Sequence, residues 1–294
     1  MRWWPFVVLA GCGRVDFDAR ARDAQTLETA CWPRLFSSDL AFDTPRQLTE
    51  LPAGTVEQAD ASLARSDLEL YFSRTESPSA IYVATRAARG LPWENPTRVG
   101  DLDAGGDAYR VTIADDDRTA VFNSLRSGTL DLYGATRSGS SFGAIGTTDV
   151  AVLDTNGQEK YPALAADGLG IYFVRVAAMR TELHATRATL DDPFGAPTEL
   201  SELGISGLIG VGDASVSPDE RVITYIAGSG PYVPYYATRA NKTDTFSAGR
   251  PIPGLSSPRG ELDTELSSDG CEVYFSSYRD RITLTDLYVA TQAP

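Results

Sequence analysis

Charged residues recur in this chain at regular intervals, so folding could gather them into one site. Arginines that closely follow apolar runs stand at Arg74, Arg126, Arg175 and Arg279. Acidic residues recur at Asp60, Asp107, Glu159, Asp213 and Asp263. Guanidinium and carboxylate groups arranged in a ring around a central funnel could bind a peptide, a glycan or a small anion. The alternative is that they form bridges within or between repeats. The repetition favours this alternative, because a ligand site usually uses residues that break a symmetry.

Three features interrupt the repetition and are therefore candidates for ligand contact. They are Tyr232 in the glycine- and proline-rich loop 228–236, the apolar loop 204–212, and the acidic run Asp101, Asp103 and Asp107. Each could equally be a loop without a binding role. With the repeated charges they lead to the predicted ligand-binding set, which is Arg74, Arg126, Arg175, Arg279, Tyr232, Asp107, Asp213 and Asp263.

Motifs for catalysis and metal binding are weak. Residues 139–143 match the GxSxG pattern of a nucleophile elbow, but no strand-to-helix turn is expected around them. His184 takes the place of a repeated tyrosine, and Asp115-Asp116-Asp117 lacks the spaced ligands of a calcium loop. We therefore predict no catalytic triad, no metal site and no cofactor. A carboxylate pair for glycoside hydrolysis stays open, because the separation of the two groups decides that chemistry.

The overall charge argues against two classes of partner, nucleic acids and anionic lipid surfaces. The chain of 294 residues has 40 acidic and 26 basic side chains, and its net charge is −14. Nucleic acids and anionic lipid surfaces need clustered Lys and Arg to replace their counterions, so we expect neither as a general partner. An acidic surface favours solubility, cation binding or basic partners. We expect the protein to be a monomer.

Five copies of one unit position these residues. The dipeptide Ala-Thr recurs at residues 84, 135, 185, 237 and 290, with spacings of 51, 50, 52 and 53 residues. A turn of the Asp-Gly type and an alternating apolar strand precede each copy, as in Asp269-Gly270 before Val273-Tyr274-Phe275. A polar loop and a last short strand follow it. Four-stranded units that repeat in this way predict an all-β, five-bladed β-propeller.

The two ends of the chain are predicted to close the ring. The fifth copy stops at Pro294 without its fourth strand, and residues 42–51 match the missing strand. An N-terminal strand that completes the C-terminal blade would join the ends and protect the edges of that sheet. We place the propeller at residues 39–294, with repeats that begin near residues 60, 107, 159, 213 and 263.

Strand direction also predicts a disulfide. We call the face that carries the loops into the first strands the top face, and the opposite face the bottom face. Cys271 opens a second strand at the bottom face, and Cys31 lies eleven residues before the closing strand, which begins there too. Eleven residues can cross two strands at about 4.8 Å each. We therefore expect a Cys31–Cys271 disulfide, with two free buried cysteines as the alternative.

The N-terminus resembles an export signal. A short apolar run, residues 3–10, follows Arg2 and is far below the ~20 residues that span a bilayer. Leu9-Ala10-Gly11-Cys12 then resembles a bacterial lipobox, which implies a signal peptide over residues 1–11, lipid on Cys12 and a tether over residues 12–38. Gly13 in the next position implies the outer membrane rather than the inner one.

The repeats resemble the TolB-type, WD-like propeller repeats of bacterial envelope proteins. The resemblance covers residues 40–292 and is carried by Ser217-Pro218-Asp219, Ser267-Ser268-Asp269-Gly270, Tyr274-Phe275-Ser276-Ser277 with Arg279, and Asp286-Leu287-Tyr288. The first copy has Ser66 in place of the turn Asp, and the fourth lacks the Arg. TolB itself has six blades and an added N-terminal domain, so its partnership with a peptidoglycan-associated lipoprotein is not carried over.

We predict from these features a lipid-anchored propeller of the bacterial envelope, on the periplasmic side or at the cell surface. It would bind or scaffold an envelope protein, a peptide or a glycan without catalysis. The alternatives are a glycan-acting, hydrolase-type propeller enzyme and a purely structural surface protein. Non-repeated carboxylates that converge on the axis of the ring would favour the enzyme.

Overall fold

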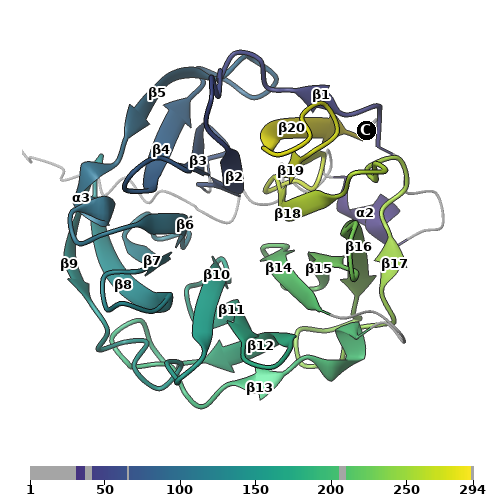
Figure 1. Cartoon of the computed structure of the whole chain (residues 1–294). Coiled ribbons are helices and arrows are strands. Elements are labelled where there is room, and N and C mark those ends of the chain that lie inside the picture. The colour runs from purple at the N-terminus through teal and green to yellow at the C-terminus, as the bar shows by residue number, and fades with distance from the viewer. Residues whose placement is uncertain (1–30, 37–41, 65, 205–209, 293–294) are drawn as a thin grey trace, which may run out of the picture.

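The computed structural model describes residues 31–294 apart from 37–41, 65, 205–209 and 293–294. Five four-stranded antiparallel sheets stand around a central axis like the blades of a propeller (Figure 1). The first strand of each blade is closest to the axis, and the fourth strand lies at the rim (Figure 1). The predicted five-bladed fold is therefore confirmed.

The blades follow one another along the chain. Blade 1 contains β2 (Gln58–Leu63), β3 (Glu69–Arg74), β4 (Ala80–Thr85) and β5 (Glu94–Arg98). Blade 2 contains β6 (Ala108–Ile113), β7 (Thr119–Ser124), β8 (Asp131–Ser138) and β9 (Ser141–Gly146). Blade 3 contains β10 (Gln158–Leu164), β11 (Gly170–Val176), β12 (Arg180–Thr186) and β13 (Thr198–Glu199). Blade 4 contains β14 (Val211–Val216), β15 (Val222–Ala227), β16 (Val233–Thr238) and β17 (Arg250–Pro251).

Blade 5 is built from both ends of the chain. Its strands are β18 (Glu261–Leu266), β19 (Glu272–Ser277), β20 (Asp286–Thr291) and the N-terminal β1 (Arg46–Gln47). In the register of β1 and β20, Arg46 is opposite Val289 and Gln47 is opposite Tyr288. This pairing is consistent with the predicted closure by an N-terminal strand. Short helices complete the chain: α2 (Trp32–Leu35), α3 (Gly100–Asp103) and the 3-10 helix η1 (Ser201–Leu203).

Aromatic and aliphatic side chains fill the space between neighbouring blades. At the junction of blades 5 and 1, Leu70 and Phe72 pack with Tyr274, Leu287 and Trp93, and all five are at most 2% exposed. Burial of each large side chain of this kind contributes about 1.5–3 kcal/mol. Both faces of a strand such as β3 are covered because each blade is stacked between two others. The alternating strand pattern of the repeat follows from this packing.

The Ala-Thr-Arg motif supports the bottom of the blades, although Arg137 in the second copy pairs with the carboxylates of Asp117 and Glu69 instead of a turn carbonyl. Arg86, Arg187 and Arg239 each donate from Nε to a backbone carbonyl in the turn between the first and second strands, over 2.6 to 2.9 Å. Gln292 does the same from Nε2 in the fifth copy, to the carbonyl of Gly270 at 2.7 Å. Each guanidinium also lies over an aromatic ring of its own blade, as Arg86 does over Trp93. The repeated motif therefore stabilises the turn between the first and second strands of these blades.

The N-terminal segment is attached at the bottom face. Cys31 and Cys271 form a disulfide with a Cα–Cα distance of 5.0 Å, which is the pairing predicted above. The backbone N–H of Cys31 donates to the carbonyl of Asp269 at 2.8 Å, and the indole of Trp32 donates to the carbonyl of Ser268. An added Cβ at Gly270 would lie 2.8 Å from the Trp32 ring, so a glycine is needed under this helix. Within the described residues, no helix has the length and apolar character needed to cross a membrane.

Candidate functional site

The same structural irregularity occurs in the first strand of every blade. The register between the first and second strands shifts at a β-bulge in all five sheets. Each shift leaves two residues without a partner, and one of the two lies seven residues before the central residue of the following turn. These five bulge residues are Asp60, Arg110, Tyr161, Asp213 and Asp263. All but Arg110 have a positive φ, between 39° and 60°. Bulges re-aim side chains and are common next to functional sites, so this ring of five is the natural place to look for one.

The acids at the bulges bind the neighbouring blade. The backbone N–H of Asp60 donates to Oδ2 of Asp263 at 2.8 Å, which joins blade 1 to blade 5. Ser73 and Ser276 donate to the two carboxyl groups, at 2.6 and 2.5 Å respectively. Burial raises the pKa of Asp60 to about 6, and it raises that of Asp263 well above its ordinary value, with the nearby Asp60 as a further cause. These two carboxyl groups therefore hold protons more readily than exposed ones.

Arg110 closes the axis of the ring below these acids. Its side chain is 1% exposed, and its Nη2 lies 2.8 Å from Oε2 of Glu265 in blade 5. It also donates to the carbonyl of Pro162 in blade 3 and to that of Ala214 in blade 4. Oε1 of Glu265 accepts the backbone N–H of Leu63 in blade 1. The ion pair and its hydrogen bonds thus connect all five blades near the axis.

Four side chains gather at the top face, and we call them the top-face cluster: Lys160, Tyr161, Arg180 and Tyr232. The Arg180 guanidinium lies 5.5 Å from the Tyr161 ring centroid and 5.6 Å from that of Tyr232. The Lys160 ammonium lies 5.3 Å from the Tyr161 ring. All four are partly exposed. No other blade of the described structure repeats this combination, so the cluster breaks the symmetry of the ring.

Local structure explains how the cluster is positioned. Nη2 of Arg180 donates to Oδ1 of Asp213 at 2.8 Å, across the junction of blades 3 and 4. An added Cβ at Gly212 would lie 3.0 Å from that Nη2 and 2.6 Å from Cγ2 of Val174, so only glycine leaves room for this contact. The carbonyl of Tyr232 accepts the backbone N–H of Glu261, which fixes its loop over blade 5.

Glu182 is the unusual buried group beside the cluster. It is 2% exposed, and neither of its carboxylate oxygens has a hydrogen-bond partner among the described residues. Burial raises its pKa to about 8, with the charge of Asp213 as the next cause, while Arg180 and Arg110 act in the opposite direction. At neutral pH this carboxyl group is therefore mostly protonated and does not cancel the charge of the two cations in the cluster.

The repeated arginines do not form the predicted ring around a funnel. Each guanidinium lies over an aromatic ring at the end of its second strand and donates to a carbonyl of the loop that precedes its own blade. The acceptors for Arg74, Arg126, Arg175 and Arg279 are the carbonyls of Pro52, Leu102, Leu153 and Leu255. Arg175 and Arg279 also pair with Glu159 and Glu261 of their own blades. These contacts correspond to the structural alternative considered above.

The predicted acids divide into two groups. Asp213 and Asp263 lie at bulges next to the axis, as their place in the repeat suggested. Asp107 lies before its strand instead, where its carboxylate accepts the N–H of Ser79 in blade 1 at 2.6 Å. The five acids therefore do not share one position, and the bulge position in blades 2 and 3 is taken by Arg110 and Tyr161.

The remaining motifs have structural partners. Asp101 accepts the N–H of Phe142, and Asp103 pairs with Arg98 at 2.7 Å. His184 stacks on Tyr172 with ring centroids 4.4 Å apart. Residues 139–143 lie at the hairpin between β8 and β9 rather than at a strand-to-helix turn. Part of the loop 204–212, and Cys12 with the predicted signal peptide, fall outside the described residues.

One group of acids in the described structure is close enough to hold a cation. Carboxylate oxygens of Asp131, Asp154 and Glu159 lie within 4.8 Å of one another. Arg175 and Thr155 already donate to Glu159, and hydroxyl groups of the loop donate to Asp131. The geometry therefore leaves a cation site possible in principle. Glu159 and Asp131, however, already accept hydrogen bonds from protein groups.

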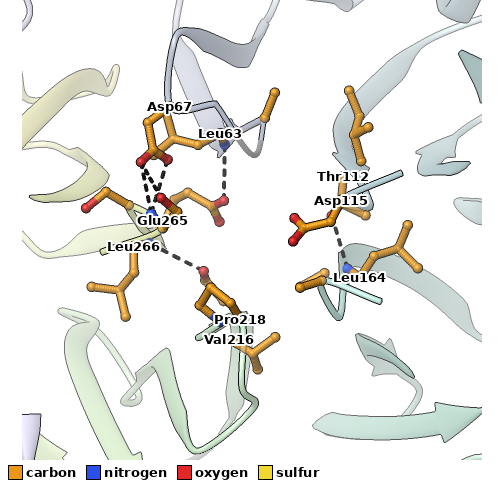
Figure 2. A pocket seen from close by; sticks show the side chains of 16 residues that line it. Leu63, Asp67, Thr112, Asp115, Leu164, Val216, Pro218, Glu265 and Leu266 are labelled. Atoms are coloured by element: carbon orange, nitrogen blue, oxygen red, sulfur yellow. Dashed lines mark hydrogen bonds between the residues drawn. The ribbon is translucent and has the colours of Figure 1, made fainter. Parts of the chain in front are cut away.

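The bottom end of the axis has a small cavity of about 70 Å³ (Figure 2). Figure 2 shows Glu265 and Asp67 on one side of it and Asp115 with Thr112 on the other. Hydroxyl groups of one blade accept backbone N–H groups of the next, as Thr112 does from Leu164 at 3.0 Å. Asp67 accepts from the backbone N–H and the hydroxyl of Ser268. Most polar groups here form hydrogen bonds that link neighbouring blades.

Sequence reasoning missed Lys160, Tyr161, Arg180 and Glu182. A signal was present for Tyr161. Each bulge residue lies seven residues before the positive-φ residue of the following turn, namely Asp67, Asp117, Gly168, Glu220 and Gly270. Counting back from the turns therefore reveals the ring of bulge residues. Nothing in the repeat indicates that Arg180, in a third strand, reaches the next blade.

Comparison with known proteins supports the fold. No family model matches the chain, and no curated protein matches its sequence. Among solved structures, a putative TolB from Agrobacterium tumefaciens has a TM-score of 0.53 at 15% identity, and covers 80% of this chain and 77% of its own. A thermostable family-43 glycoside hydrolase has a TM-score of 0.56 at 12% identity, with coverages of 82% and 91%.

A third similar structure is the catalytic domain of the GH62 α-L-arabinofuranosidase of Coprinopsis cinerea. It has a TM-score of 0.54 at 13% identity and covers 86% of this chain and 97% of its own. At such low identity these likenesses show the propeller fold alone, because one fold hosts many functions. Both a TolB and glycoside hydrolases share the architecture, so the function must be argued from the site.

Proposed function

We propose that the protein is a β-propeller binding module whose ligand, a glycan or a peptide, binds at the top-face cluster. The observation that carries this proposal is the non-repeated group of Lys160, Tyr161, Arg180 and Tyr232, which unites two aromatic rings with two cations. Tyrosine rings offer a large contact area with a polar rim, and cations fix the orientation of a polar ligand. Sites of this kind are found where a fold departs from its own symmetry.

The backbone at Tyr161 supports the same proposal. Its φ of 56° lies in the left-handed region, where a bulky side chain is rare. Such a conformation costs on the order of 1–3 kcal/mol and tends to be kept at functional sites. The N–H of Tyr161 donates to the side-chain oxygen of Asn123, which holds the residue in this conformation. The protein therefore maintains a strained aromatic residue next to the axis.

The buried acids favour binding over catalysis. Asp60, Asp213 and Asp263 are between 1% and 6% exposed. Each already has a partner inside the protein: Ser73 for Asp60, Arg180 for Asp213 and Ser276 for Asp263. A general acid or base must lie within hydrogen-bond reach of the substrate, and these side chains are occupied in building the floor of the site.

The proposal is tested by ligand binding to the full mature chain. Purified protein is titrated with peptidoglycan fragments, polysaccharides and peptides, first as wild type and then as Tyr232→Ala. We expect the variant to bind about tenfold more weakly, because a stacked aromatic contact is lost. Phe36→Ala is the matched control, since Phe36 is an exposed aromatic residue directly after the bottom-face helix α2. Equal binding by both variants would place the ligand elsewhere.

A second candidate is a glycan-acting enzyme, and the raised pKa of Asp60, rather than its contacts, is the observation that favours it. The pKa of Asp60, about 6, falls in the range of a general acid or base near neutral pH. The family-43 and GH62 glycoside hydrolases share the fold. The test is turnover of aryl glycosides by the wild type and by Asp60→Asn. Hydrolysis by the wild type that is lost in Asp60→Asn would support the enzyme function. Absence of turnover over a broad panel of aryl glycosides would contradict it.

We also propose that the protein is lipid-anchored in the bacterial envelope through Cys12, with the top face pointing away from the membrane. The attachment of Cys31 and α2 at the bottom face supports this orientation. Incorporation of a labelled fatty acid by the wild type and its loss in Cys12→Ser would support the anchor. Unchanged membrane association of Cys12→Ser would contradict it.

A further inference from the structure

Lys160 is a cation without a partner beside a group of paired charges. Its ammonium forms no ion pair and no hydrogen bond within the part of the chain that the structure describes, and it lies over the Tyr161 ring at 5.3 Å. Partial burial lowers its pKa, with the nearby Arg180 as the next cause, while the charges of Asp213 and Asp60 act in the opposite direction without forming an ion pair with it. In a chain of net charge −14, an unpaired and partly buried cation is costly unless something else neutralises it. This position therefore suits an anionic group of a ligand.

Two further groups of the same site lack partners. Nε of Arg180 and both carboxylate oxygens of Glu182 are buried without a hydrogen bond among the described residues. Buried polar groups are normally satisfied, so each such group calls for an explanation. Glu182 lies near enough to Asp213 and Arg180 for their charges to shift its pKa. The unsatisfied groups thus lie at or near the Arg180–Asp213 ion pair.

The inner edges of blades 1 and 3 have backbone donors that are not free to pair with a peptide strand. Side chains of neighbouring blades accept the N–H groups that face the axis. The acceptors are Asp263 for Asp60, Glu265 for Leu63, Asn123 for Tyr161 and Thr112 for Leu164. Strand addition needs free backbone donors, so these bonds argue against a peptide that binds by extending a sheet. A ligand with its own rings and hydroxyl groups fits the two tyrosines better.

We propose that the top-face cluster binds an acidic saccharide, with the ligand carboxylate between Lys160 and Arg180 and a sugar ring against Tyr232. This inference rests on the proposed binding function and specifies its ligand. Charge-assisted contacts to a carboxylate are the strong hydrogen bonds of a site. The Tyr161 and Tyr232 rings near Arg180 supply the apolar contact that a pyranose ring needs. Nothing in this arrangement requires a covalent step.

The test compares each acid with its own methyl ester. The probes are trisaccharides of galacturonic, glucuronic and mannuronic acid, each beside its fully methyl-esterified form, titrated calorimetrically into the full chain. Esterification removes the charge and leaves the rings and hydroxyl groups in place. We expect at least one acid to bind about tenfold or more tightly than its ester, since a charge-assisted hydrogen bond is lost in the ester. Equal affinity of every acid and ester would overturn the inference.

Variants assign the preference to the cluster. Lys160→Met should abolish the preference for the acid, and Lys160→Arg should keep it, because it retains the charge. Arg118→Gln is the control, since Arg118 is exposed in the turn between β6 and β7 at the bottom face. Circular dichroism and urea midpoints establish that each variant is folded. An acid preference that survives in Lys160→Met would refute the assignment.

The remaining outcomes separate this inference from the broader proposal. Binding of an acetylated acidic tripeptide, with no binding of any saccharide, would overturn the acidic saccharide and leave a binding function at the same face. Binding of neutral sugars alone, lost in Tyr232→Ala, would do the same. Absence of binding for every probe would overturn both proposals together.

Discussion

Glu182 should make the stability of this protein fall as the pH rises. The side chain is 2% exposed, and its two carboxylate oxygens have no hydrogen-bond partner among the described residues. Burial and the charge of Asp213 raise its pKa from 4.5 to about 8. The folded protein therefore holds a proton on Glu182 over a pH range in which the unfolded chain has already released it.

The magnitude follows from the shift of the pKa. Below about pH 4.5 the carboxyl group is protonated in both states and contributes no pH dependence. Between that value and about pH 8 only the unfolded chain is ionised, so the free energy of unfolding falls by about 1.4 kcal/mol per pH unit. The whole interval amounts to roughly 5 kcal/mol. Above pH 8 both states are ionised and the loss is complete.

The substitution Glu182→Gln removes this titration and keeps the shape of the side chain. We expect the variant to match the wild type near pH 4 and to be more stable by several kcal/mol at pH 8. The measurement is the free energy of unfolding in urea at half-unit steps of pH for both proteins. Glu199→Gln, at an exposed position on the adjacent strand β13, is the control. A difference between wild type and Glu182→Gln that stays constant from pH 4 to pH 8 would refute the reasoning.

Three other perturbations test the architecture. Arg110→Met should lower the free energy of unfolding by about 3–5 kcal/mol, because it leaves a buried carboxylate unpaired, and adding Glu265→Leu should restore part of the loss in the same urea assay. Reduction of Cys31–Cys271, which spans 240 residues, should cost up to roughly 5 kcal/mol, measured by thermal unfolding with and without reductant. Tyr161→Asn should raise the melting temperature, because asparagine tolerates a positive φ, while ligand affinity falls. A lower melting temperature for that variant would show that packing of the ring outweighs the backbone strain.

Much of the fold could be predicted because it depends on local patterns that repeat. Ala-Thr-Arg, the Asp-type turn and the alternating strand each reflect contacts made within one blade or with the next one, and those contacts recur in most copies. The closure could be predicted because a blade with a missing strand must be completed. The pairing of Cys31 with Cys271 followed from the direction in which strands run.

The candidate site was predicted only in part. Asp213, Asp263 and Tyr232 lie where a ligand site was expected, because their positions follow from the repeat and from one irregular loop. The repeated arginines follow the structural alternative that their repetition favoured. Their charge suggested a ligand, whereas their guanidinium groups lie on aromatic rings and bind carbonyls of the preceding loop, as Arg126 does with Leu102.

The sequence by itself determined the number of blades, their strand order and the way in which the ring closes. These properties depend on the spacing of the repeats and on contacts between residues that lie close together within a repeat. Such spacing can be recognised in the sequence without the three-dimensional structure. Only the tertiary structure decided which charges meet. Lys160 and Tyr161 in a first strand, Arg180 in a third strand and Tyr232 in the loop of another blade come together through the curvature of the ring. Arg180 pairs with Asp213 across two blades, and burial raises the pKa of Glu182. Proximity and desolvation are three-dimensional properties, so they appear only once the chain is folded.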